Sequence, residues 1–327
     1  MDTQRFSRIA NGLKSASISS VTQTADALRR EGKEVLVFSI GRPDFDTPEH
    51  IKAAANDALA KGFVHYTHNR GILPMREAVA AYLKRQNGLD YDPKTEIMIT
   101  AGAQEALMLC THALLNPGDE ALIPAPAFLS YGSCVHMASG VPVFVPTEQA
   151  KGFQPEPDVL ERHITPKTKL ILINSPQNPT GTVYPRETLQ GIADLAIKHD
   201  LIVVSDEINE KIIFDGEEHI SIASLPGMRE RTVVLNGFSK AYSMTGWRLG
   251  YMAAPKDIIS ASVRLHQHIN TCASSFVQEA GITALKQAGP DVQKMLAEYQ
   301  RRRDYVVEAI NQIDGLSCNK PKGAFYL

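Results

Sequence analysis

The feature that most constrains the fold is an alternation of short, apolar, β-rich runs with amphipathic segments between residues 95 and 270. Continuous apolar runs are typical of strands buried on both faces, and helices between them are typical of parallel connections. The sequence therefore predicts an α/β fold with a mostly parallel central sheet and helices on both faces. Strands are expected at 95–101, 121–124, 141–145, 168–174, 201–207, 231–237 and 247–253, and helices at 103–115 and 186–200.

The last two expected strands, 231–237 and 247–253, are joined by only nine residues. A parallel crossover needs a dozen or more residues. We therefore expect this pair of strands to be antiparallel.

The pattern changes after residue 277. Residues 289–313 predict a long amphipathic helix whose basic run, 301–303, lies on a solvated face, and residues 315–327 predict the start of a strand. A strand without a following partner is unusual, so we expect a smaller α+β domain that is truncated at its C-terminus. The predicted divisions are 1–44 (N-terminal arm and part of the small domain), 45–276 (large domain) and 277–327 (incomplete small domain).

Composition excludes several kinds of partner. The formal net charge of −2 offers no basic surface for nucleic acid or an anionic membrane. No apolar run approaches the roughly 20 residues that span a bilayer, and the N-terminus has no apolar signal segment. The four cysteines are scattered singly and are expected to be reduced. We therefore expect a cytoplasmic protein.

Polar, glycine-rich or aromatic residues directly follow five of the expected strands. In open α/β sheets, ligands bind beyond the carboxyl ends of the strands. We therefore expect these segments to line one pocket. They are residues 102–104, 125–128, 175–181, 206–207 and 239–240.

The residue types at these strand ends suit one kind of ligand. The amine of Lys240 would form a Schiff base with an aldehyde if its pKa fell below the usual value of about 10.4. Asp206 would hold a positively charged ring nitrogen. Arg248 and the helix start at 102–104 suit a phosphate. A phosphorylated aromatic aldehyde with a pyridine nitrogen is pyridoxal 5′-phosphate.

Three further side chains suit the same ligand. Ser239 would donate its hydroxyl to the phosphate, Phe128 would stack on the ring, and Asn178 would bond the phenolic oxygen. Each also has a simpler explanation, because a phenylalanine is more often a core residue and an asparagine before a proline often serves a turn. A lysine such as Lys240 is, by itself, most often a surface residue.

A serine hydrolase is the alternative from another class. Residues 237–241 are close to the strand-to-helix turn around a nucleophilic serine, here Ser239, and Asp257 and His266 follow in the expected order. Ala241 stands where that motif has its final glycine. The hydrolase hypothesis also leaves the other strand-end residues without a role, so it is disfavoured.

Two other possibilities are weaker still. A cofactor-binding regulator normally has a basic DNA-binding module, which the charge of −2 does not support. The histidines of "HYTH" (65–68) and "HQH" (266–268) have no nearby cysteine or acidic ligand at a recognised spacing. We therefore expect no metal.

The segments "SPQNPTG" (175–181), "SDEINEK" (205–211) and "SKAYSMTGWRLG" (239–250) resemble the signature segments of one enzyme family. This family is the class I pyridoxal-phosphate-dependent aminotransferases, in the aspartate aminotransferase-like branch. The resemblance covers nearly the whole chain and implies the fold type I of pyridoxal-phosphate-dependent transferases and an activity of EC 2.6.1.-. Other segments match in order and spacing, at 38–48, 65–78, 100–107 and 114–128.

The resemblance implies a role for each matching residue. Lys240 would form the internal aldimine and move protons at the substrate, and Asp206 would pair with the pyridine nitrogen. Tyr66 would reach the phosphate of a neighbouring subunit, which implies a homodimer with shared active sites. The other expected cofactor contacts are Ala103, Gln104, Phe128, Asn178, Asn209, Ser239 and Arg248, and the expected substrate contacts are Gly41 and Asn178.

The implied reaction moves an amino group between an L-amino acid and a 2-oxo acid by a ping-pong mechanism. The chain departs from the family pattern in two ways. Asn209 stands where the family usually has a tyrosine, which leaves a pyridoxal-phosphate-dependent lyase or decarboxylase as the alternative. The family's arginine for the substrate α-carboxylate would lie beyond Leu327. The sequence does not identify the amino acid.

Overall fold

The computed structural model describes residues 5–13 and 17–327, which form two compact units, 1–42 and 43–327. The first unit contains α1 (Arg8–Gly12), where the side chain of Ser7 accepts a bond from the N–H of Ala10, and α2 (Ser17–Arg30). The boundary predicted at residues 276 and 277 remains a prediction. Among the described residues, no helix is both long and apolar enough to traverse a bilayer.

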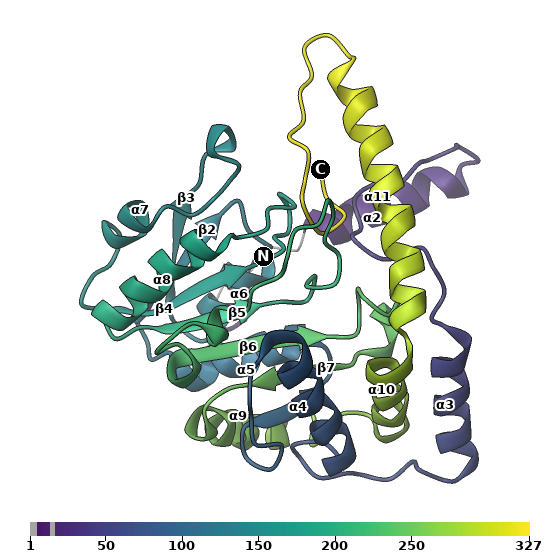
Figure 1. The fold of residues 1–327 in the computed structure, drawn as a ribbon, viewed down its shortest axis with the longest axis vertical. Helices are drawn as coiled ribbons and strands as arrows, with labels where there is room; N and C mark the ends of the chain where they lie inside the picture. The colour runs from purple at the N-terminus through teal and green to yellow at the C-terminus, as the bar shows by residue number, and fades with distance from the viewer. Residues whose placement is uncertain (1–4, 14–16) are drawn as a thin grey trace. The chain divides into compact units, whose positions relative to one another are not determined.

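Among the described residues, the second unit has a seven-stranded sheet of order β1-β7-β6-β5-β4-β2-β3 (Figure 1). The ladders from β6 through β5, β4 and β2 to β3 are parallel. β7 is antiparallel to both β6 and β1. The antiparallel pairing with β6 confirms the prediction from their nine-residue connection. The strands are β1 (Ile97–Thr100), β2 (Glu120–Ala125), β3 (Val141–Pro146), β4 (Thr168–Asn174), β5 (Ile202–Asp206), β6 (Thr232–Gly237) and β7 (Gly250–Ala253).

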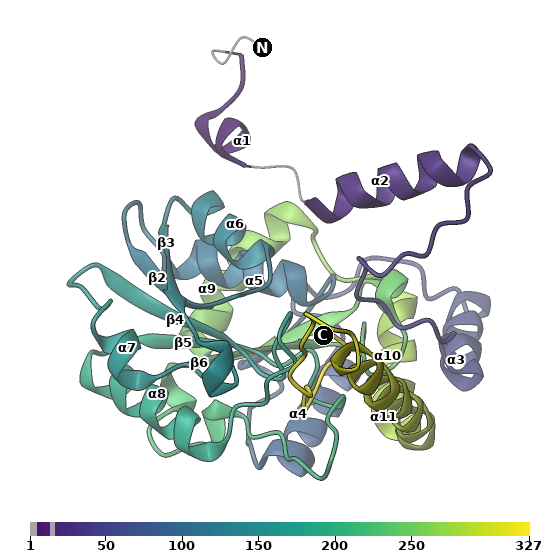
Figure 2. The same cartoon turned by 90° about the horizontal axis from the view of Figure 1, so that it is seen from above.

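Helices cover both faces of this sheet (Figure 2). On one face, α5, α6 and α9 pack against strand residues such as Leu172 and Leu235. On the other face, α8 packs against Ile171 and α4 and α10 pack near Val234. Because successive strand residues point to opposite faces, continuous apolar runs fill both layers. The helices are α3 (Glu49–Ala60), α4 (Leu73–Asn87), α5 (Ala103–Leu114), α6 (Ser130–Met137), α7 (Pro157–Glu161), α8 (Arg186–Lys198), α9 (Lys256–Ile269), α10 (Ser275–Gln287) and α11 (Gly289–Asn311), with 3₁₀ turns at Gln149–Lys151, Ile222–Ser224, Arg229–Arg231 and Thr245–Trp247.

The last expected strand begins later than the sequence predicted. β7 starts at Gly250 rather than residue 247, because Thr245–Trp247 form a 3₁₀ turn and Arg248 has a φ of 53°, in the left-handed region. The 3₁₀ turn and the left-handed residue reverse the backbone just before β7, and the conformation of this segment sets the position of Arg248.

Two predictions for the C-terminal part are wrong. Residues 315–327, all described, form no strand; Gly323 makes one isolated bridge to Ile213, and Lys322 and Gly323 both donate to the carbonyl of Gly181. The basic run is not wholly solvated, since Arg303 is 5% exposed and its guanidinium bonds both carboxylate oxygens of Asp215 at 2.8 Å. The end of the described chain therefore packs on loops of the large sheet.

Candidate active site

The parallel ladders bring the ends of β4, β5 and β6 to one edge of the sheet. Asp206, the last residue of β5, is in register with Leu235 of β6 and with Asn174 of β4. The side chain of Asn174 donates to the backbone oxygen of Asp206 at 2.8 Å. Lys240 follows β6 by three residues, and its amine is close enough to Asp206 for their charges to interact.

Asp206 is a buried carboxylate with two local donors. The Tyr131 hydroxyl donates to Oδ2 at 2.8 Å, and the backbone N–H of Ile208 donates to Oδ1 at 3.1 Å. Burial raises the pKa of Asp206 above its ordinary value, while these two hydrogen bonds act to lower it. A cationic partner at this carboxylate would favour its ionised form.

Tyr131 is a site residue that the sequence analysis missed. It lies in α6, where its ring packs edge-on against Phe128, with centroids 5.6 Å apart. Phe128 is half-buried, so part of this ring remains available to a ligand. A tyrosine on a short helix has no sequence signal that indicates a bond to an aspartate 75 residues away.

Lys240 has the electrostatic environment that an amine nucleophile needs. Burial, aided by repulsion from Arg248, lowers the pKa of its amine to about 8, although Asp206 acts to raise it. Its Nζ lies 5.6 Å from the ring centroid of Phe325, a second residue that the sequence analysis did not identify. At pH 8, about half of such amines are neutral.

The turn before α5 is shaped by two glycines. Gly102 precedes the helix with a φ of 84°, and a Cβ on it would lie 2.6 Å from a guanidinium nitrogen of Arg248. A Cβ on Gly250 would lie 2.5 Å from the carbonyl carbon of Gly102 and 2.6 Å from the nitrogen of Ala103. Only glycine permits this approach, which brings β7 directly behind the first turn of α5.

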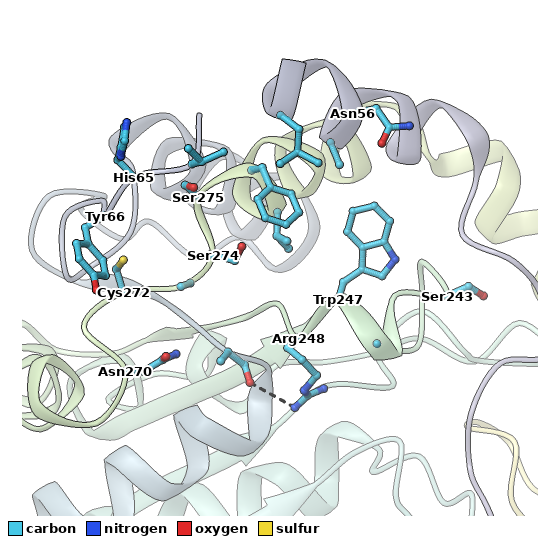
Figure 3. Close-up of a pocket in the computed structure, with 18 residues that line it drawn as sticks. Asn56, His65, Tyr66, Ser243, Trp247, Arg248, Asn270, Cys272, Ser274 and Ser275 are labelled. Atoms are coloured by element: carbon cyan, nitrogen blue, oxygen red, sulfur yellow. Dashed lines mark hydrogen bonds between the residues drawn. The ribbon is translucent and has the colours of Figure 1, made fainter. Parts of the chain in front are cut away.

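This turn has the donors that a phosphate requires. The first N–H groups of a helix have no intrahelical acceptor, and the helix start carries a partial positive charge. At the start of α5 these groups belong to Ala103 and Gln104. The exposed guanidinium of Arg248 lies beside them and donates to the carbonyl of Ala101 at 3.3 Å (Figure 3). The side chain of Gln104 donates to Cys134, so its backbone is the part available to a ligand.

The remaining predicted cofactor contacts lie near these strand ends. Asn178 is half-buried, and its backbone N–H donates to Asn174 Oδ1 at 2.7 Å. Asn209 is buried, and its Nδ2 donates to the carbonyl of Pro176 at 3.2 Å, while its Oδ1 has no hydrogen-bond partner among the described residues. Ser239 is half-buried beside Lys240.

Two further predicted residues are Gly41 and Tyr66. Gly41 belongs to the unit 1–42, which is described by itself. Tyr66 is 87% exposed and lines a cavity of about 1160 Å³ that also borders Arg248. Figure 3 shows Tyr66 and Arg248 on separate parts of this lining.

The residues at the strand ends fit pyridoxal phosphate. The glycine-shaped turn and Arg248 match a phosphate dianion. A buried carboxylate matches a protonated ring nitrogen, and an amine whose pKa is about 8 matches an aldehyde. These three donor and acceptor types are the ones that this cofactor needs.

Comparison with known proteins identifies the family. Residues 33–327 match the family model for class I and II aminotransferases. The chain therefore belongs to this family of pyridoxal-phosphate-dependent enzymes, and it is an aminotransferase of EC 2.6.1.-.

Individual relatives agree with this assignment. The chain is 48% identical to aromatic-amino-acid aminotransferase 2 of Thermococcus litoralis, over 90% of the chain and 76% of the relative. It is also 48% identical to an aspartate aminotransferase of Pyrococcus abyssi, over 90% and 76%. An aspartate aminotransferase structure from Thermus thermophilus with maleate superposes with a TM-score of 0.94 at 40% identity, covering 98% of this chain and 83% of that one.

The structure also bears on the hydrolase and metal hypotheses. His266 is fully buried, and the carboxylate beside its Nδ1 is Glu105, at 3.3 Å, rather than Asp257, the acid of the hydrolase hypothesis. Among the described residues, one group of metal-ligand types lies close together, namely Glu207, Glu210 and His219. His219 Nε2 lies 3.0 Å from Glu207 Oε2, two serine hydroxyls donate to Glu207, and the Tyr82 hydroxyl donates to Glu210.

The close approach of Gly250 to the α5 turn leads to a prediction. Gly250→Ala must displace the turn at Gly102, and we expect affinity for pyridoxal phosphate to fall at least ~tenfold, since small displacements at such sites are costly. Fluorescence titration of the apoprotein measures this. Gly289→Ala is the matched control, because a Cβ there meets nothing within 4 Å. Equal affinity in the two variants would contradict the role of the close approach.

Proposed function

We propose that this aminotransferase acts through Lys240 and Asp206, with Arg248 and the first turn of α5 holding the cofactor phosphate. The observation that supports this most strongly is the burial of an amine and a carboxylate together at adjacent strand ends, β6 and β5. Burying an amine and a carboxylate at one site costs desolvation free energy for both groups. Functional sites are where such perturbed groups cluster.

The cofactor supplies an aldehyde for the amino group and a ring that withdraws electrons from the substrate Cα. Lys240 Nζ, with its pKa of about 8, accepts the Cα proton near neutral pH and later donates it. Asp206 would accept a hydrogen bond from the ring nitrogen and keep a proton there. Tyr131 positions that carboxylate by its bond to Oδ2.

The other predicted residues would hold and orient the cofactor and the substrate. Phe128 would cover one face of the ring and exclude water from it, and Asn178 would bond the phenolic oxygen and the substrate. Asn209 offers an amide where a tyrosine hydroxyl is usual, and its buried Oδ1 lacks a partner among the described residues. The proposed set is completed by Ala103, Gln104 and Ser239 for the phosphate and Gly41 for the substrate.

The proposal includes a homodimer in which Tyr66 of each chain reaches the phosphate site of the other. Tyr66 is 87% exposed, and Val64 and Leu59 beside it in the cavity lining are 56% and 41% exposed. Exposed aromatic and aliphatic side chains that gather around a polar site are typical of an interface. A second copy would cover them and supply a hydroxyl near Arg248.

A mixed-variant experiment tests the shared site. The native mass should be twice the chain mass of 35.8 kDa. Mixing Lys240→Ala protein with Tyr66→Phe protein should restore activity above that of either alone, because one of the two sites in a hybrid dimer has both native residues. A monomer by light scattering, or a mixture no more active than its components, would contradict the shared site.

The substrates are proposed to be an acidic or aromatic L-amino acid and a 2-oxo acid. The support is that similar proteins are named as aspartate and aromatic-amino-acid aminotransferases. Product release before the second substrate binds would give ping-pong kinetics.

A panel of L-amino acids with 2-oxoglutarate tests the reaction. We expect a new 2-oxo acid and glutamate in equal amounts, with aspartate or an aromatic amino acid fastest. Borohydride reduction of the loaded protein, followed by peptide mapping, should place a pyridoxyl group on Lys240. Ammonia or carbon dioxide release without glutamate would instead indicate a lyase or decarboxylase, and labelling of Ser239 by a fluorophosphonate would indicate a hydrolase.

A further inference from the structure

Glu105 lies directly behind the turn that is proposed to bind phosphate. It is the third residue of α5, and its Oε2 accepts the backbone N–H of Ala101 at 2.5 Å. The carbonyl of the same residue, Ala101, accepts from Arg248 at 3.3 Å. The two polar groups of Ala101 are therefore held by Glu105 on one side and by Arg248 on the other.

Glu105 is itself held by a histidine of the neighbouring helix. His266 lies in α9, which packs along α5, and it is fully buried with Nδ1 3.3 Å from Glu105 Oε1. The side chain of Glu105 is only 12% exposed. Although burial acts to raise the pKa of Glu105, its bonds to His266 and Ala101 outweigh burial and lower it, so the carboxylate stays ionised.

We propose that Glu105 and His266 are a pair of positioning residues that fix the Ala101–Gly102 turn, and thereby the affinity of this site for the phosphate of its ligand. This proposal rests on the proposed function, which places the phosphate at Arg248 and α5. Nδ1 of His266 lies 3.3 Å from Oε1, and Oε2 accepts the N–H of Ala101. With its N–H held, Ala101 presents its carbonyl, in the following peptide unit, to Arg248.

The geometry predicts which part of the ligand is affected. Glu105 bonds the turn at Ala101 and His266 lies against Glu105, whereas the groups proposed for the aldehyde and ring nitrogen are Lys240 and Asp206 at other strand ends. Loss of the pair should weaken binding of a phosphorylated ligand much more than binding of the same molecule without phosphate. A general loss of packing would weaken both equally.

The test compares the apoprotein's affinity for pyridoxal 5′-phosphate with its affinity for pyridoxal. Glu105→Asp keeps the charge but is one methylene too short to reach Ala101, and we expect the ratio of the two affinities to fall roughly tenfold, as for loss of a hydrogen bond to a charged group. Glu105→Gln keeps the length and one acceptor oxygen for the N–H of Ala101, and its NH2 can donate to the unprotonated Nδ1 of the other His266 tautomer, so the ratio should stay within about threefold of native.

A second pair of variants tests the histidine. His266→Leu removes the ring nitrogen beside Glu105 Oε1 and should lower the same ratio roughly tenfold. His266→Asn retains an N–H near the position of Nδ1 and should keep the ratio within about threefold. Thermal unfolding of each apoprotein shows that the fold is intact, and inorganic phosphate should compete less well in the Asp and Leu variants than in their amide counterparts.

The outcomes distinguish a failure of the Glu105–His266 pair from a failure of the proposed phosphate site. A ratio that is unchanged in Glu105→Asp, or lower in Glu105→Gln than in Glu105→Asp, overturns the positioning pair, and these two polar variants decide the matter even if His266→Leu does not fold. Equal losses for both ligands also overturn it. A native protein that binds pyridoxal phosphate no better than pyridoxal would instead show that the proposed phosphate site is wrong.

Discussion

The site depends on the burial of an amine and a carboxylate at the ends of two neighbouring parallel strands. Desolvation penalises both charges, so it lowers the pKa of Lys240 to about 8 and raises that of Asp206, while their mutual attraction opposes both shifts. The register of β5 on β6 maintains this arrangement, and apolar residues such as Val234 and Leu235 hold these strands in the core. The packing of the sheet therefore lowers the pKa of the Lys240 amine and so raises its neutral fraction near pH 8.

A second constraint is the glycine-mediated contact between β7 and the start of α5. Gly250 lets the strand pass against Gly102, and the left-handed backbone of Arg248 turns its guanidinium to the same helix start. Behind this turn, Glu105 and His266 hold Ala101 from the core side. The proposed phosphate site and the Lys240 amine thus belong to different strands of one sheet, and the strand order sets their separation.

The sequence predicted the elements whose residues have local signals. Apolar runs identified every strand of the sheet, and a short connection identified the antiparallel pairing of β6 and β7. It failed at 315–327, because those residues bond the loops at Gly181 and Ile212 rather than a strand. The contacts of Tyr131 with Asp206 and of His266 with Glu105 were missed because each is made through space, between elements distant in the chain.

The most direct test of this account is the titration of the Lys240 amine in the apoprotein, measured by pH-dependent acylation and mass spectrometry of its peptide. We predict half-maximal reactivity near pH 8 and a lower midpoint in Asp206→Asn, because that substitution removes the attraction that raises the pKa of the lysine. Reactivity that follows the ordinary lysine value of 10.5, or a midpoint that rises in Asp206→Asn, would contradict it.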